Sequence, residues 1–147
     1  MSRARTLLVG GNDVFLDGVV EWVAQDAQLE IVGRANTGAA ALEQIEALQV
    51  DLALVDVILP DMNGFEVSRR MKARADAPLV VLLSFYDTQG ARLEAWAAGA
   101  DGFVPQSKTT THLKPLVGDL FRRRQTAVHE QGAVSSTSPV PPKDVAE

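Results

Sequence analysis

The chain has no cysteine, only two histidines, and few aromatic residues, which make up 5% of its 147 residues. Without cysteine it can form neither a disulfide framework nor a thiolate metal site. Charged residues or glycine interrupt the apolar stretches well before the roughly 18 residues needed to span a bilayer. The first apolar run, residues 6–9, is too brief for the core of a signal peptide. The composition therefore predicts a cytoplasmic protein with no membrane partner.

A surplus of positive charge is missing as well. Lys and Arg number 14 and Asp and Glu number 19, so the formal net charge is −5. We expect no direct contact with nucleic acid from a chain of this charge. The one basic run, Arg122–Arg124, is interpreted as cations that stabilise the C-terminal end of a last helix rather than as a phosphate-binding patch.

What the chain does contain is a regular alternation of short apolar runs and amphipathic stretches. The runs predict buried strands at residues 6–9, 29–35, 52–55, 79–83 and 102–105. The stretches after them predict helices at residues 14–24, 38–48, 65–75, 89–98 and from 112 onward. The last helix is expected to begin only after Thr111, because Pro115 is tolerated in a first turn and not further inside a helix.

Strands that are apolar on both faces belong to a parallel sheet covered on both sides. The predicted fold class is therefore α/β, a five-stranded parallel sheet with five helices on both faces. The alternation stops near Gln125, and the remainder is rich in Ser, Thr, Pro and Ala. We predict one domain, residues 1–124, and a disordered tail, residues 125–147, with no DNA-binding domain after it.

The candidate functional residues follow the predicted strands, because an open parallel sheet gathers its functional groups at the C-terminal ends of the strands. Asp56 ends the third strand and Ser84 the fourth. The segment from Asp51 to Gly64, DLALVDVILPDMNG, resembles the phospho-acceptor block of response-regulator receiver domains, in which Pro stands four residues and Gly eight residues after the acceptor Asp.

Three further blocks agree with this resemblance in order and spacing. They resemble the first helix, the second strand and its turn, and the fifth-strand entry of receivers that carry LuxR-type output domains, and they lie at residues 14–18, 32–42 and 99–104. The resemblance covers about Thr6 to Arg124. It implies the flavodoxin-like fold of CheY-like receivers, and its implied partners are a sensor histidine kinase or another signalling protein.

The resemblance also implies a role for single residues. Asp56 corresponds to the phospho-acceptor, and Ser84 to a hydroxyl that hydrogen-bonds a phosphoryl oxygen. Ile58 would offer its backbone carbonyl to Mg²⁺. Phe103 corresponds to an aromatic residue that turns inward and alters the face made by the fourth and fifth helices, through which a homodimer is expected; a core aromatic that never moves is the alternative interpretation.

Three positions depart from the family pattern. Gly10 and Gly11 replace the acidic pair that helps the acceptor to hold Mg²⁺, and Gln106 replaces a Lys that pairs with the phosphoryl group. An acyl phosphate, of charge about −2, would have no fixed cation beside it, and one carboxylate supports Mg²⁺ only weakly. Losing metal and cation stabilisation predicts phosphorylation of Asp56 slowed by orders of magnitude.

For three other residues we favour a structural role over a functional one. Asn12 and Asp13 are expected to cap a helix rather than to replace the missing metal ligands. Trp96 is expected to be buried on the fourth helix rather than to face a partner.

Two functions stay open from the sequence. The first is an atypical receiver in a two-component phosphorelay, which signals by protein contact. The second is a pseudo-receiver, a phosphorylation-independent interaction or ligand-sensing module. An enzyme such as a haloacid-dehalogenase-type phosphatase needs a second Asp two residues after the nucleophile, where this chain has Ile58. We therefore expect no enzyme.

Overall fold

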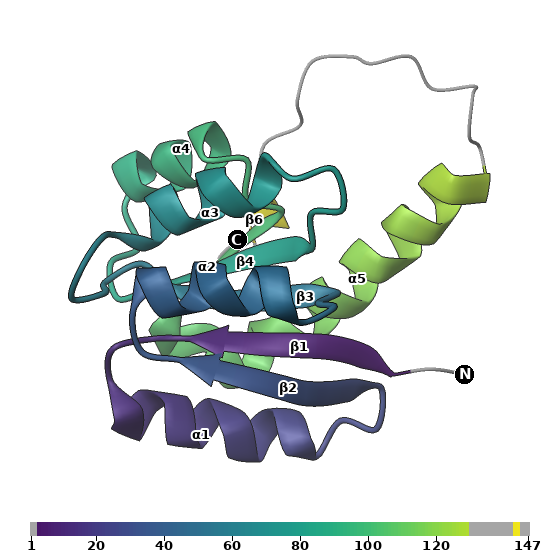
Figure 1. The fold of residues 1–147 in the computed structure, drawn as a ribbon, viewed down its shortest axis with the longest axis horizontal. Helices are drawn as coiled ribbons and strands as arrows, with labels where there is room; N and C mark the ends of the chain where they lie inside the picture. Colours follow the sequence, from purple (N-terminus) through teal and green to yellow (C-terminus); the bar gives the residue numbers. More distant parts are fainter. Residues whose placement is uncertain (1–2, 130–142, 145–147) are drawn as a thin grey trace.

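The computed structural model of the chain describes residues 3–129 and 143–144, and strands and helices alternate along it (Figure 1). The strands are β1 (Ala4–Val9), β2 (Leu29–Ala35), β3 (Leu52–Asp56), β4 (Leu79–Ser84), β5 (Gly102–Pro105) and β6 (Lys143–Asp144). The helices are α1 (Asp13–Ala24), α2 (Gly38–Ala47), α3 (Gly64–Lys72), α4 (Gln89–Ala97), the 3₁₀ turn η1 (Gln106–Lys108) and α5 (Thr109–His129).

All strand pairs are parallel, and the sheet order is β2-β1-β3-β4-β5-β6. The five long strands in the order 2-1-3-4-5, with five α-helices around them, confirm the predicted fold class. None of the helices in the described part of the chain combines the length and the apolarity that a membrane crossing needs.

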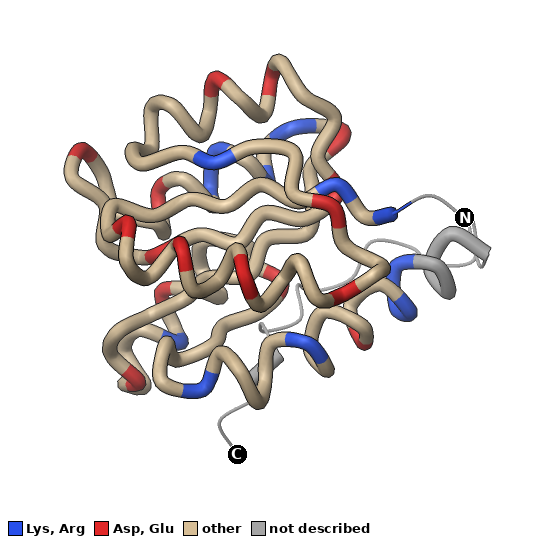
Figure 2. Tube along the Cα trace, turned by 90° about the horizontal axis from the view of Figure 1, so that it is seen from below, with Lys and Arg blue, Asp and Glu red and all other residues tan. Residues whose placement is uncertain are grey.

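Two hydrophobic clusters fill the two faces of the sheet. Helices α2, α3 and α4 cover one face, and α1 and α5 cover the other (Figure 1). In strand β3, Ala53 and Val55 point into the first cluster, while Leu52 and Leu54 point into the second. Both faces of the strand are therefore buried, which explains its unbroken apolar run. Most charged residues lie on the outer helices and loops, with both signs mixed (Figure 2).

Side-chain caps fix where four of the helices begin, at the edge of the sheet where the strands end. The oxygens of Asn12, Thr37, Asn63 and Thr88 accept hydrogen bonds from the first-turn amides of α1, α2, α3 and α4, at 2.9 to 3.1 Å. The capping role expected of Asn12 is confirmed. Asp13 is different: it is the first residue of α1, and its carboxylate makes other contacts described below.

The start of the last helix was predicted wrongly. Helix α5 begins at Thr109, not after Thr111, and Pro115 lies inside it. Pro115 cannot donate to the carbonyl of Thr111, but both residues are exposed, so water can take the place of the missing N–H. Buried Leu113 and Leu116 hold this turn of the helix against the sheet.

Regular structure continues beyond residue 124, where a disordered tail was expected to begin. Helix α5 continues to His129, and residues 143–144 pair with β5 as the short strand β6. The rest of the predicted tail, residues 130–142 and 145–147, lies outside the described residues.

The expected burial of Trp96 was also wrong. The residue is 39% exposed on α4, and Leu93 on the preceding turn is exposed too. Helix α4 packs on the sheet through alanines, of which Ala95 is fully buried. Such small side chains fill the space between helix and sheet, and the larger apolar side chains remain outside.

Candidate functional site

Asp56 is the last residue of β3, and it is buried with 4% of its surface exposed. Its Oδ1 accepts hydrogen bonds from the backbone amide of Ile58 at 3.0 Å and from the side-chain amide of Gln106 at 3.2 Å. Burial raises the pKa of Asp56, and these two hydrogen bonds oppose that rise in part. The carboxylate is therefore held by neutral donors.

Gly10 and Gly11 occupy the positions of the acidic pair that the resemblance implies, Gly10 beside Asp56 and Gly11 beside the loop that follows it. A Cβ atom on Gly10 would stand 3.5 Å from the Cβ of Asp56, and one on Gly11 would stand 3.9 Å from the carbonyl oxygen of Ile58. The remaining space is tight, because the same two Cβ atoms would meet Leu16 Cδ2 at 3.0 Å and Pro60 Cδ at 3.1 Å. The structure thus brings the predicted positions together around Asp56.

The loop after Asp56 depends on Gly64. The Gly64 amide donates to the carbonyl of Val57 at 2.7 Å. A Cβ atom at residue 64 would lie 2.5 Å from the carbonyl oxygen of Asp56 and 2.8 Å from the Cα of Val57. Only glycine lets the start of α3 approach the end of strand β3 this closely, which accounts for the Asp-to-Gly spacing noted in the sequence.

Asp61 holds the same loop in place, a role that nothing in the sequence indicated. Its two carboxylate oxygens accept hydrogen bonds from the amides of Gly38 at 2.8 Å and Ala39 at 2.9 Å, at the start of α2. These hydrogen bonds lower the pKa of Asp61. Its partners lie more than 20 positions away in the chain, so no local pattern could have announced the contact.

Ser84 ends β4 and is buried, but its hydroxyl is engaged within its own loop. The Oγ donates to the carbonyl of Tyr86 at 2.6 Å and accepts from the Tyr86 amide at 3.1 Å. Phe85 and Tyr86 are exposed, with their rings edge to face at 5.2 Å. Phe103 on β5 is buried in the cluster under α2, α3 and α4.

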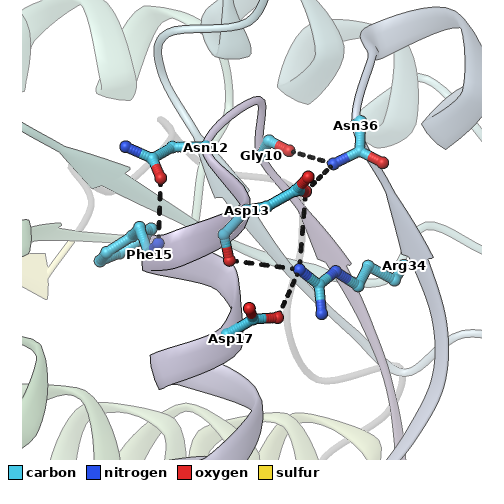
Figure 3. A network of polar contacts seen from close by, with 7 residues as sticks. All are labelled: Gly10, Asn12, Asp13, Phe15, Asp17, Arg34 and Asn36. Carbon is cyan, nitrogen blue, oxygen red and sulfur yellow. Dashed lines mark hydrogen bonds and ion pairs between the residues drawn. The ribbon is translucent and has the colours of Figure 1, made fainter.

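Asp13 belongs to a polar network next to Gly10 (Figure 3). Its carboxylate accepts a hydrogen bond from Asn36 at 2.8 Å and lies 3.6 Å from the guanidinium of Arg34, which also pairs with Asp17 at 2.8 Å. Asn36 donates in addition to the carbonyl of Gly10 at 3.1 Å. The network ties α1 to β2, so the expectation that Asp13 caps a helix was wrong.

The residues around Asp56 do not fit a magnesium ion well. Within residues 3–124, whose side chains the structure describes, no group of three or more His, Cys, Asp or Glu could hold a metal. Asp56 and the carbonyl of Ile58 remain as donors, fewer charged ligands than Mg²⁺ ordinarily takes when no phosphate is present.

Comparisons with known proteins identify the family. The model of the "Response regulator receiver domain" family matches residues 7–117. The chain belongs to the response regulator receiver domain family. The DNA-binding transcriptional activator DevR/DosR of Mycobacterium tuberculosis is 33% identical over 116 residues, which are 79% of this chain and 54% of that protein. The transcriptional regulatory protein NarL of the same species is 31% identical over 122 residues, 83% of this chain and 56% of that protein.

Solved receivers share the fold. The signal receiver domain of NarL from M. tuberculosis superposes with a TM-score of 0.78 at 30% identity, covering 83% of this chain and 98% of that one. A CheY-like receiver from Methanospirillum hungatei gives 0.71 at 22% identity, covering 88% and 99%. This receiver chain spans about half the length of the two mycobacterial regulators it matches.

Proposed function

We propose that this receiver works in a two-component phosphorelay in the cytoplasm, with Asp56 as a weak phospho-acceptor, and that it signals by protein contact rather than by catalysis. One observation carries the proposal. Asp56 is buried at the end of β3, and its hydrogen-bond donors, the Ile58 amide and Gln106, are neutral. The position of an acceptor is kept, while its counter-charges are not.

The expected weakness follows from charge. Phosphoryl transfer to Asp56 would build about two negative charges in a buried place. Gln106 can donate a hydrogen bond to a phosphoryl oxygen, but it brings no positive charge. Gly10 and Gly11 supply no ligand side chain to Mg²⁺. Lost metal and cation stabilisation is worth several kcal/mol in such reactions, which is several orders of magnitude in rate.

A surface for protein contact is present on α4 and the loop before it. Four large apolar side chains are exposed there: Phe85, Tyr86, Leu93 and Trp96. Exposed apolar side chains gathered in one place mark interaction sites more often than chance exposure does. A sensor histidine kinase, another signalling protein, or a second copy through the α4 and α5 face could bury them.

The test is incubation with acetyl phosphate and Mg²⁺ followed by intact-mass measurement. We expect a small fraction of the chain to gain ~80 Da, and the Asp56→Asn variant to gain nothing. The triple variant Gly10→Asp, Gly11→Asp, Gln106→Lys serves as the positive control. An adduct that persists in Asp56→Asn, or no adduct in the wild type when the triple variant is labelled, would remove Asp56 as an acceptor.

The second outcome corresponds to a pseudo-receiver, and one contact favours it. The Ser84 hydroxyl donates a hydrogen bond to the carbonyl of Tyr86 and accepts one from its amide. It must break these hydrogen bonds before it can reach a phosphoryl oxygen. Under this alternative, beryllofluoride with Mg²⁺ moves no backbone amide signal of residues 56–58 or 84–86. Under the first proposal it moves them at high concentration.

A further inference from the structure

A cation from α4 lies on the buried aromatic ring of β5. Phe103 is 1% exposed and pairs in the sheet with Leu82 of β4. The guanidinium carbon of Arg92 lies 5.3 Å from the centroid of the Phe103 ring. At such a distance the negative face of an aromatic ring attracts a cation. The Arg92 side chain is itself only 21% exposed.

Asp87 holds this cation in place. It precedes α4 by two residues, and its Oδ1 accepts a hydrogen bond from Arg92 Nη2 within an ion pair. Near the N-terminal end of a helix the macrodipole disfavours a cation and favours an anion. Asp87 therefore offsets the unfavourable position of Arg92, and the pair connects the loop before α4 to the ring of Phe103.

The loop between β4 and α4 has two further fixed points. The Ser84 hydroxyl is bonded to the backbone of Tyr86, and the Thr88 hydroxyl accepts from the Ala91 amide at 3.1 Å. Together with the Asp87–Arg92 pair, these contacts fix the conformation of the loop, and all of their partners lie within residues 84–92. None of them involves Asp56, whose own hydrogen bonds go to the loop after β3 and to Gln106.

We propose that Arg92 is a positioning residue: paired with Asp87, it holds Phe103 inward and fixes the loop that carries Phe85 and Tyr86. The shape of the contact surface on α4 then depends on this ion pair. The inference rests on the proposed function, because it takes the α4 surface as the one that a partner meets.

The test compares full-length chains carrying Arg92→Met, Arg92→Lys or Asp87→Asn with the wild type. Phenylalanine labelled with ¹³C in the ring reports the surroundings of Phe103, and hydrogen exchange reports the Tyr86 amide. We expect Arg92→Met and Asp87→Asn to shift the Phe103 ring signals and to speed exchange at Tyr86. Arg92→Lys, which keeps the charge but not the planar group, should retain both in part. Arg70→Met, which removes an exposed arginine of α3, is the matched control and should change neither.

Unchanged Phe103 signals and unchanged Tyr86 exchange in both Arg92→Met and Asp87→Asn would overturn the proposal. Should Arg92→Met not fold, Asp87→Asn and Arg92→Lys still decide, because Asp87 lies in an exposed loop. These measurements need no phosphoryl donor, so a failed mass adduct at Asp56 and a failed Arg92 result are told apart.

Discussion

Two aspartates at opposite ends of the sheet differ in the charge of their partners. Asp101, just before β5, accepts from Lys72 Nζ at 2.7 Å and from the Val80 amide at 2.8 Å, and Lys72 also donates to the carbonyl of Pro78 at 2.9 Å. Asp56, at the end of β3, is more deeply buried and meets only neutral donors. Charge is balanced where it holds the fold together and left unbalanced where the family does its chemistry.

The difference teaches where stability and function separate in this receiver. The Asp101 end joins α3 to the start of β4 and β5 through an ion pair that is largely covered. The Asp56 end keeps the loop geometry, through Gly64 and Asp61, but not the charges. Changes that alter charge at Asp56 should therefore change chemistry, and changes at Asp101 should change stability.

The largest effect is expected from restoring charge around Asp56. The triple variant Gly10→Asp, Gly11→Asp, Gln106→Lys should accept phosphate from acetyl phosphate faster than the wild type by roughly two orders of magnitude or more, as metal and cation stabilisation return. Quenched intact-mass time courses measure the rate. The new side chains require Leu16 and Pro60 to give way by a few tenths of an ångström, since they would otherwise stand about 3 Å from the new Cβ atoms.

Magnesium supplies the control for that experiment. Without phosphoryl donor, Mg²⁺ should raise the melting temperature of the triple variant and leave the wild type unchanged, because only the variant gains carboxylate ligands. Equal rates in the two chains, with Mg²⁺ bound by the variant, would show that the pocket is closed for another reason, such as the bonded hydroxyl of Ser84.

Gly64→Ala should disrupt the close approach of α3 to the end of β3. The new methyl would stand 2.5 Å from the carbonyl oxygen of Asp56, and backbone atoms cannot move aside as a side chain can. We expect a loss of about 3 kcal/mol or more in the free energy of unfolding, measured with urea. Gly18→Ala is the matched control, because nothing lies within 4 Å of its added methyl; in mid-helix it should stabilise by about 0.5–1 kcal/mol. A cost equal to that control would contradict the close approach at Gly64.

These glycines also show how far the sequence reaches. The apolar run before Asp56 predicted strand β3, and the glycine at residue 64 stands where local backbone geometry demands it. The acceptor role of Asp56 came from the resemblance of several blocks together and stays a prediction. The contacts of Arg92 with Phe103 and of Asp61 with α2 join segments that lie apart in the sequence. Hydrophobic periodicity could therefore not predict them. Trp96 was misjudged because helical spacing tells which side chains share a face, not which face the alanines bring against the sheet.

Asp101→Asn tests the balanced end of the comparison. It leaves Lys72, which is only 21% exposed, without its anion. We expect a loss of about 2 kcal/mol in the free energy of unfolding and no change in the phosphorylation rate of the triple background. Asp76→Asn removes the partner of Arg74 from an exposed pair and should cost at most about 0.5 kcal/mol. Equal losses in the two variants would mean that burial at Asp101 adds nothing.

The smallest effect is expected from Asp56→Asn, and pH identifies it. Because burial raises the pKa of Asp56 in the folded chain, the folded state holds this proton more tightly than the unfolded one. The stability so gained is complete below the unfolded pKa of about 3.9 and is lost as the pH rises through the folded value. Asn does not titrate and can accept the same two hydrogen bonds. The variant should therefore gain on the wild type as the pH rises.

Asp61→Asn gives the opposite sign and completes the test. The amides of Gly38 and Ala39 lower the pKa of Asp61, so its contribution to stability is present above the unfolded pKa and is lost as the pH falls through the folded value. Urea unfolding from about pH 3 to pH 8 should show Asp61→Asn losing ground to the wild type as the pH rises, while Asp56→Asn gains. If the free energy of unfolding changed with pH in the same direction for both variants, the hydrogen bonds of Asp56 would compensate its burial as fully as those of Asp61 do. The contrast between Asp56 and Asp101 would then be wrong.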